Sequence, residues 1–267
     1  MRYFVHISYN GINYHGWQRQ KNAISVREVF EKGLEQILKE PINCIGCGRT
    51  DTQVHASQYF FHFDVTKEWD FDLLFRLNRL LPNDISVFDI IPVEANQHAR
   101  YDAISRTYNY FIHTFKDPFF NERSSLYFET NLNLEKMNQA VQLISKYSEF
   151  YSFCLSPEKQ FSTTCRISSA QLFSNHSADR IRFQITSNRF LKGMIRVIVG
   201  KLLEVGTGKL LVEEFENLLK CKIALYNTRP AFPQGLYLTK VTYPYLNLPA
   251  RNDITRGGLN EWIEVTA

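Results

Sequence analysis

The order of strand-like and helix-like segments is the feature of this sequence that most restricts its fold. Residues 3–9 and 57–64 alternate between apolar and polar side chains, which is typical of β-strands. Between them, Ser25 and Glu28 form an S-x-x-E capping box at the start of an amphipathic helical segment that Pro41 ends. Because strands and helices do not alternate strictly along the chain, the sequence predicts an α+β fold.

Aromatic residues favour extensive sheet structure. The 267 residues include 21 Phe and 14 Tyr, and Tyr59, Phe61 and Phe63 fall on one face of the strand at 57–64. The hydrophobic share of 44% and the charged share of 22% are those of a chain that builds a globular core.

The remaining segments continue the same pattern in two halves. Further strands are predicted at 42–47, 85–91, 104–114, 165–173, 180–187 and 235–243, and further helices at 70–80, 133–146, 190–205 and 211–221. We therefore expect two α+β halves, residues 1–103 and 104–267, whose mixed or antiparallel sheets join into one continuous sheet. No clear internal sequence repeat connects them.

Positive charge is concentrated in one part of the chain. The whole chain has a net charge of +4, but residues 159–201 contain eight lysines and arginines and a single acid, Asp179, a local charge of +7. A one-sided basic surface is the electrostatic footprint expected of a protein that binds nucleic acid.

The cysteines and the apolar segments exclude other classes. Cys44 and Cys47 have the C-x-x-C spacing of a zinc or redox site, but no second cysteine pair accompanies them, so we expect reduced, buried thiols and no metal. The N-terminus has the pattern of a strand and not of a signal peptide, and Arg196 and Lys201 interrupt the longest apolar stretch. We expect a soluble cytoplasmic protein with no membrane partner.

A short loop at 48–56 carries the most reactive combination of side chains. Arg49 and Asp51 stand two residues apart, and on an extended backbone such residues point to the same side. The arginine would then hold the carboxylate ionised. Two other interpretations are an exposed ion pair that contributes little and a turn or N-cap aspartate.

Five stretches together resemble the tRNA pseudouridine synthase A (TruA) family. They are GRTDTQVHA (48–56), YHGWQRQ (14–20), HARYDAISRTYNY (98–110), MIRVIVGKLLEVG (194–206) and GLYL (235–238), in the order in which the family has them. The resemblance implies isomerisation of uridine to pseudouridine in the tRNA anticodon stem-loop, at positions 38, 39 and 40, without a cofactor. It also implies two pseudosymmetric halves with helices on one face of the sheet and a central active-site cleft.

The same resemblance assigns roles to individual residues. Asp51 matches the catalytic aspartate, Arg49 the arginine used in base flipping, and Arg196 a guanidinium that would keep Asp51 ionised. Tyr108 would stack on the flipped uracil and help to remove its C5 proton, and Leu236 would wall the uracil pocket. Each has a plainer interpretation: Tyr108 and Leu236 as core residues of strands, and Arg196 as part of a solvated helix stripe.

Binding of the tRNA anticodon arm, by a homodimer in this family, would need cations on its phosphates. The candidates are Arg166, Arg180, Arg182, Arg189 and Lys192, with an ordinary solvated surface as the alternative. Thr52-Gln53 departs from the family's usual Ala-Gly, and if that glycine has a positive φ, Gln53 would strain the loop.

Two other functions compete with the isomerase. One is a catalytically impaired tRNA-binding or folding protein of the same fold, which the Thr52-Gln53 departure leaves open. The other is an RNA hydrolase in which Asp51 activates water with a metal, but no second or third carboxylate clusters near it in the sequence.

Overall fold

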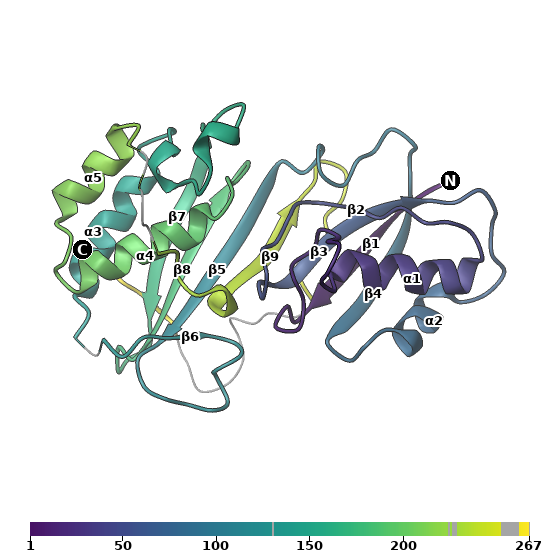
Figure 1. The fold of residues 1–267 in the computed structure, drawn as a ribbon, viewed down its shortest axis with the longest axis horizontal. Helices are drawn as coiled ribbons and strands as arrows, with labels where there is room; N and C mark the ends of the chain where they lie inside the picture. The colour runs from purple at the N-terminus through teal and green to yellow at the C-terminus, as the bar shows by residue number, and fades with distance from the viewer. Residues whose placement is uncertain (130, 224, 226–228, 252–261, 267) are drawn as a thin grey trace. The chain divides into compact units, whose positions relative to one another are not determined.

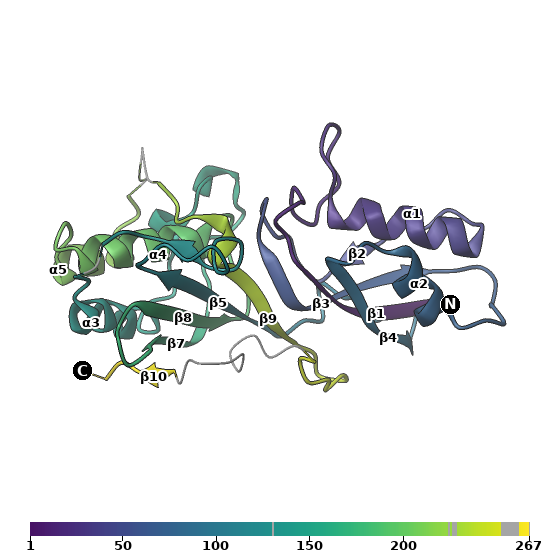
Figure 2. The same cartoon turned by 90° about the horizontal axis from the view of Figure 1, so that it is seen from below.

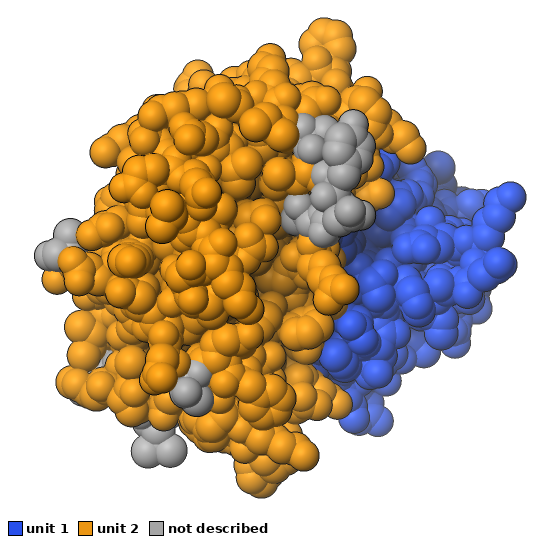
Figure 3. Space-filling model, turned by 60° about the vertical axis from the view of Figure 1, so that its left-hand side comes forward, with its two compact units in different colours: residues 1–106, 237–254 blue, residues 107–236, 255–267 orange. Residues whose placement is uncertain are grey.

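The computed structural model describes residues 1–129, 131–223, 225, 229–251 and 262–266, and its contacts divide the chain into two compact units (Figure 3). Unit 1 comprises Met1–Arg106 and Tyr237–Ile254, and unit 2 comprises Thr107–Leu236 and Thr255–Ala267. The predicted halves, 1–103 and 104–267, placed the whole C-terminal segment in the second half. In the structure, residues 237–254 group with the first.

Unit 1 is a mixed sheet with two helices (Figures 1 and 2). Its strands lie in the order β9-β3-β1-β4, with β2 on β3; β1 is antiparallel to β3 and β4, and β9 is parallel to β3. The elements are β1 (Arg2–Tyr9), α1 (Val26–Leu38), β2 (Ile45–Gly46), β3 (His55–Asp64), α2 (Leu73–Leu80), β4 (Ile85–Val93) and β9 (Leu236–Thr242).

The predicted cap and apolar stripe of the first helix are confirmed. Ser25 is the N-cap of α1 and accepts a hydrogen bond from the Glu28 amide (3.3 Å). The buried side of the helix packs on the aromatic face of β3, with the Phe30 and Phe61 ring centroids 4.8 Å apart. Trp17 adds a ring 4.4 Å from Tyr59, so the aromatic alternation of β3 builds the core of unit 1.

Strand β3 is buried on both faces, except at Asp64. The C-terminal segment packs against this strand and is attached to it by the side chain of Gln58. Its Oε1 accepts from the Val241 amide (2.9 Å) and its Nε2 donates to the Leu248 carbonyl (3.1 Å). These bonds, with the pairing of β9 on β3, place residues 237–251 in unit 1.

Unit 2 is a sheet with three helices on one side (Figures 1 and 2). Its strand order is β10-β7-β8-β5, with β6 parallel to β5. The elements are β5 (Ser105–His113), β6 (Ser125–Leu126), α3 (Leu134–Ile144), β7 (Ile167–Ser174), β8 (Arg180–Ser187), α4 (Met194–Gly206), α5 (Val212–Lys220) and β10 (Ile263–Glu264). Three 3₁₀ turns, at Tyr151–Phe153, Pro157–Lys159 and Pro233–Gly235, add to the predicted elements.

One helix begins later in the structure than the sequence predicts. The apolar helix expected from residue 190 begins only at Met194, because Gly193 before it has a φ of 68°. This φ lies in the left-handed region, which glycine adopts readily and which a right-handed helix does not contain. Gly193 therefore belongs to the turn before α4 and not to the helix. Among the described residues, no helix combines the length and the apolar character that crossing a membrane requires.

The exposed face expected for β8 is wrong at Arg182, which is 7% exposed. Its guanidinium lies over the rings of Phe173 (3.9 Å) and Trp262 (5.2 Å), and its Nη1 donates to Asn109 Oδ1 (3.2 Å). The residue alternates with Ile181 and Phe183 as predicted, but aromatic rings cover the second face of the sheet.

We therefore expect Arg182→Glu to destabilise the protein. The substitution places a carboxylate among aromatic rings and removes one of the two side-chain donors to Asn109 Oδ1, which should cost about 3 kcal/mol or more in the free energy of unfolding. Denaturant unfolding measures this. Arg166→Glu, at an exposed position, is the matched control and should change stability by no more than about 0.5 kcal/mol. Equal stabilities of the two variants would contradict the burial of Arg182.

Candidate active site

The Asp51 loop lies between β2 and β3. Thr50 is buried and its Oγ1 lies 2.9 Å from the Tyr9 hydroxyl, whereas Arg49 is exposed and Asp51 is half-buried. The Tyr59 hydroxyl donates to the carbonyl of Gly48 (2.7 Å). Arg49 and Asp51 thus flank a buried Thr50 in the sequence.

Residues 10–17, which contain the start of the YHGWQRQ stretch, support this loop from one side. The Gln53 amide donates to the Tyr14 carbonyl (3.0 Å) and the Trp17 amide donates to the Thr50 carbonyl (3.4 Å). Two glycines allow the backbones to approach so closely. A Cβ atom on Gly11 would overlap the Val54 carbonyl, and one on Gly16 would overlap the Thr50 carbonyl.

Gln53 adopts the strained conformation that the sequence raised as a possibility. Its φ is 64°, and the Val54 amide donates to the Asp51 carbonyl (3.2 Å), which closes a four-residue turn. Thr52 has no positive φ, so the turn is of type II, whose third position normally takes glycine. The loop keeps the path that a glycine would give and carries the cost of a left-handed glutamine.

His55 fixes the loop where it enters β3. Its Nδ1 accepts a hydrogen bond from the Gly11 amide (3.0 Å), and its ring stacks on Tyr237 of β9 at 4.4 Å and 17°. The ring is buried, with 1% exposed. These contacts make His55 a structural residue of the loop.

Arg106 is a loop-supporting residue that the sequence analysis did not single out. Its Nε and Nη2 both donate to the Cys47 carbonyl (3.2 and 2.7 Å), immediately before the Asp51 loop. The same guanidinium donates to the carbonyls of Ala103 (3.1 Å) and Arg100 (2.8 Å). The only available signal was its position within the HARYDAISRTYNY stretch.

The other predicted catalytic residues belong to unit 2. Tyr108 lies on β5, is 8% exposed, and meets the ring of Phe190 edge-on at 5.2 Å. Arg196, in the first turn of α4, donates from Nε to the Ala231 carbonyl (2.7 Å), and the Ala231 amide donates back to the Arg196 carbonyl (2.9 Å). The first bond orients the Arg196 side chain, and the second joins the two backbones.

Leu236 is held in place by the segment that precedes it. The Tyr110 hydroxyl donates to the Phe232 carbonyl (2.7 Å), and the Phe232 amide donates to the Tyr127 hydroxyl (3.0 Å). The 3₁₀ turn at Pro233–Gly235 then delivers Leu236, which is 6% exposed, at the start of β9. Burial alone is equally compatible with a core role and with a pocket wall.

The structure sorts the predicted phosphate-binding residues. Arg166 and Lys192 are exposed and Arg189 is half-buried. Arg180 lies over the Phe120 ring (4.0 Å), 3.9 Å from Asp117. Arg182 is buried, and its prediction as a phosphate ligand is therefore corrected: the rings that cover it leave no side for a phosphate.

The cysteines are reduced, as predicted. Cys44 and Cys47 are buried and unbridged, and burial raises the pKa of both thiols, that of Cys47 to about 11. They therefore remain protonated at neutral pH and belong to the core of unit 1. No group of three or more His, Cys, Asp or Glu side chains that could hold a metal occurs in the described part of the chain.

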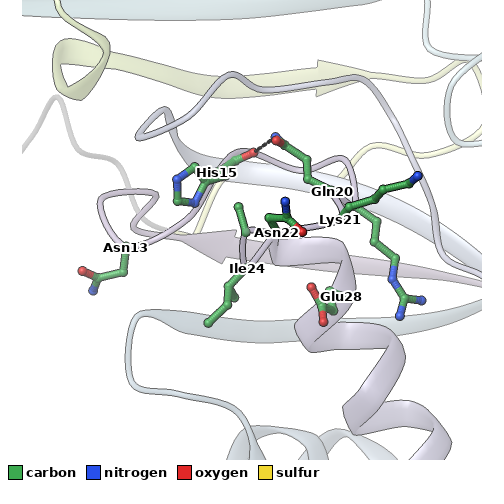
Figure 4. A pocket seen from close by; sticks show the side chains of 9 residues that line it. Asn13, His15, Gln20, Lys21, Asn22, Ile24 and Glu28 are labelled. Atoms are coloured by element: carbon green, nitrogen blue, oxygen red, sulfur yellow. Dashed lines mark hydrogen bonds between the residues drawn. The ribbon is translucent and has the colours of Figure 1, made fainter.

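A pocket of about 590 Å³ lies at the N-terminal end of α1 (Figure 4). Polar side chains of residues 13–24 and Glu28 line it, and Gln20 Nε2 donates to the His15 carbonyl at its edge (2.8 Å). None of the predicted catalytic residues is among those lining it. The pocket is open and polar, and no residue of the Asp51 loop lines it.

Comparison with known proteins agrees with the sequence motifs. A family model described as tRNA pseudouridine synthase matches residues 148–244. Curated relatives named tRNA pseudouridine synthase A include one from Porphyromonas gingivalis, 39% identical over 91% of this chain and 97% of the relative, and one from Bacteroides fragilis, 40% identical over 91% and 96%. A relative of the same name from Thermoanaerobacter pseudethanolicus is 37% identical over 89% and 97%.

The left-handed Gln53 generates a stability prediction. We expect Gln53→Gly to raise the free energy of unfolding by roughly 0.5–1 kcal/mol, because relief of the strained φ outweighs the added freedom of the unfolded chain. Thr52→Gly, at a residue with ordinary φ, is the control and should lower it by about the same amount. Denaturant unfolding of the two variants should therefore shift in opposite directions.

The contacts of Arg106 generate a prediction about the rigidity of the loop. Arg106→Gln should speed amide hydrogen exchange at Thr50 and Gln53, since the Cys47 carbonyl loses both of its guanidinium bonds. Arg106→Lys, with one donor group in place of the fork, should have an intermediate effect. Amide hydrogen exchange in α1, which contacts Trp17 through Phe30, is the internal control. An equal increase of the exchange rate in α1 would indicate general destabilisation of the protein instead.

Proposed function

Because the chain belongs to the tRNA pseudouridine synthase A family, we propose that it isomerises uridine to pseudouridine in the anticodon stem-loop of tRNA, at positions 38, 39 and 40. The observation that carries the proposal is the Asp51 loop, held by backbone bonds from residues 10–17 and by Arg106. A carboxylate fixed in this way suits a reaction that depends on the exact placement of a nucleophile.

The chemistry is a rearrangement that consumes nothing. The bond from ribose C1′ to uracil N1 breaks, the bond from C1′ to C5 forms, a proton leaves C5 and N1 gains one. Asp51 acts on the nucleoside as an anion, through either the ribose or the uracil ring, and needs no cofactor. A cation beside this half-buried carboxylate would stabilise its charge during the reaction.

We assign that cation to Arg196 and a different task to Arg49. The Arg196 guanidinium is oriented by its bonds with Ala231, which suits a fixed charge partner. Arg49 is exposed at the outer side of the loop, where it can enter an RNA stem in place of the extruded base. Flipping the uridine costs a few kcal/mol, which such an insertion helps to offset.

Tyr108 and Leu236 are proposed to hold the extruded uracil. Tyr108 is buried in an aromatic environment with Phe190, which keeps its ring in one orientation. Stacking on one base contributes about 1–3 kcal/mol. Its hydroxyl would help to remove the C5 proton, and Leu236 would form an apolar wall.

The larger assembly follows the family. We propose that residues 1–103 and 104–267 form pseudosymmetric halves that share one sheet, with the site in a central cleft. We also propose that the protein acts in the cytoplasm as a homodimer on the anticodon arm of tRNA. The phosphates would be contacted by Arg166, Arg189 and Lys192, and also by Arg180.

A catalytically impaired tRNA-binding protein is the alternative, favoured only by the strained Gln53 in the Asp51 loop. The two functions separate in one assay. The protein is incubated with unmodified tRNA without added metal, and pseudouridine is mapped. Binding without any pseudouridine would support the alternative.

We expect Asp51→Asn to abolish isomerisation while the affinity for tRNA stays within several-fold of the wild type. Asparagine keeps the shape of the side chain but removes its charge, so substrate binding survives and the chemistry does not. Asp70→Asn, at an exposed aspartate of unit 1, is the control and should retain activity. Pseudouridine formation by the Asp51→Asn protein would refute the proposed mechanism.

A further inference from the structure

The loop between the 3₁₀ turn at Tyr151–Phe153 and strand β7 presents an aromatic ring entirely to solvent. Phe161 has a relative exposure of 109%, and Leu155 in the same loop is 41% exposed. A fully exposed phenylalanine contributes nothing to the core of unit 2. Its whole surface is therefore open to contact with another molecule.

The base of this loop is fixed, so the ring stands on a defined support. The Phe150 amide donates to the Thr163 carbonyl (3.1 Å), the Cys165 amide donates to the Ser148 carbonyl (2.8 Å), and the Leu155 amide donates to the Lys192 carbonyl (3.1 Å). Leu155 packs on Gly193, where a Cβ atom would overlap its side chain. The loop is thereby attached to the turn that begins α4.

Exposed cations surround the loop. Lys159 lies within it, Arg166 follows it, and Lys192 contacts its backbone; all three are exposed, and none forms an ion pair within the described ranges. Two other cations of the basic stretch 159–201 are occupied: aromatic rings cover Arg182, and Lys201 pairs with Glu204 (2.8 Å). Glu158 is the one acid between residues 155 and 166.

The loop also lies on the Tyr108 side of unit 2. Tyr108 contacts Phe190, which is two residues before Lys192, and the Lys192 carbonyl accepts the bond from Leu155. A short chain of contacts within one unit thus leads from the proposed uracil-stacking ring to the exposed loop.

We propose that Phe161 stacks on a base of the tRNA next to the extruded uridine, while Lys159, Arg166 and Lys192 hold the adjacent phosphates. The inference rests on the proposed function, because it takes tRNA as the substrate. Extrusion of one base leaves its neighbours without a stacking partner, and an aromatic ring between cations is the surface that such bases recognise. The unpaired cations select RNA over an apolar protein partner, since they would otherwise be desolvated without compensation.

The test measures binding of a fluorescent anticodon-arm RNA hairpin with 2-aminopurine beside the target uridine, at several salt concentrations. Phe161→Ala should weaken binding by about 5- to 150-fold, the range that corresponds to loss of one stacked base. The slope of log affinity against log salt should not change, because Phe161 contacts no phosphate. Phe161→Trp should retain the wild-type affinity and quench the 2-aminopurine.

Two controls isolate the effect. Phe119→Ala removes another highly exposed ring, at 84%, from a different loop of unit 2 and should leave the affinity within about twofold, since a typical exposed substitution has little effect. Lys192→Gln should instead make the salt slope shallower by about one unit. Both variants use the full chain, and the exposed positions leave the fold intact.

The outcomes distinguish the inference from the function on which it rests. Wild-type protein that does not bind the hairpin overturns both. If the wild-type protein binds the hairpin and Phe161→Ala shows the same affinity and the same 2-aminopurine fluorescence as the wild type, this inference alone is overturned. The isomerase proposal then still stands. If Phe161→Ala changes the sedimentation of the protein without changing RNA affinity, a second copy of the chain occupies the ring, and the inference is again overturned.

Discussion

The close approach of two backbone segments, residues 10–17 and the Asp51 loop, is the contact on which the rest of unit 1 depends. It is possible only because Gly11 and Gly16 carry no side chain where the carbonyls of Val54 and Thr50 pass. The amides of Gln53 and Trp17 then find partners across the contact instead of remaining unsatisfied. Each buried amide left without a partner would cost about 1–3 kcal/mol, so the loop has one favourable path.

Aromatic packing beneath the loop makes this path rigid. Trp17 is 2% exposed and lies between Tyr59 and Phe61, so the segment that contains Gly16 is anchored in the core. From the other direction the Tyr59 hydroxyl and Arg106 hold the carbonyls of Gly48 and Cys47. The loop is therefore restrained on both flanks, and this restraint allows a residue with the unfavourable φ of Gln53 to persist at its turn.

Unit 2 orients its functional side chains in the same way, by bonds to main-chain carbonyls. Arg196 Nε donates to the Ala231 carbonyl, and the Ala231 amide donates to the Arg196 carbonyl. The Tyr110 hydroxyl donates to the carbonyl of Phe232, the residue after Ala231. Bonds of this kind fix a side chain without neutralising its charge.

The sequence by itself determined the features that depend on near neighbours or on a motif. These include the Ser25 cap of α1, the aromatic face of β3, the buried thiols of Cys44 and Cys47, and membership of the family. Tertiary structure alone decided which side chains are covered. Arg182 alternates as an exposed residue would, yet Phe173 and Trp262 enclose it, and Arg106 reaches carbonyls far along the chain. Capping and alternation are set by residues two to four positions apart, whereas the burial of a strand's second face depends on distant segments that no local pattern identifies.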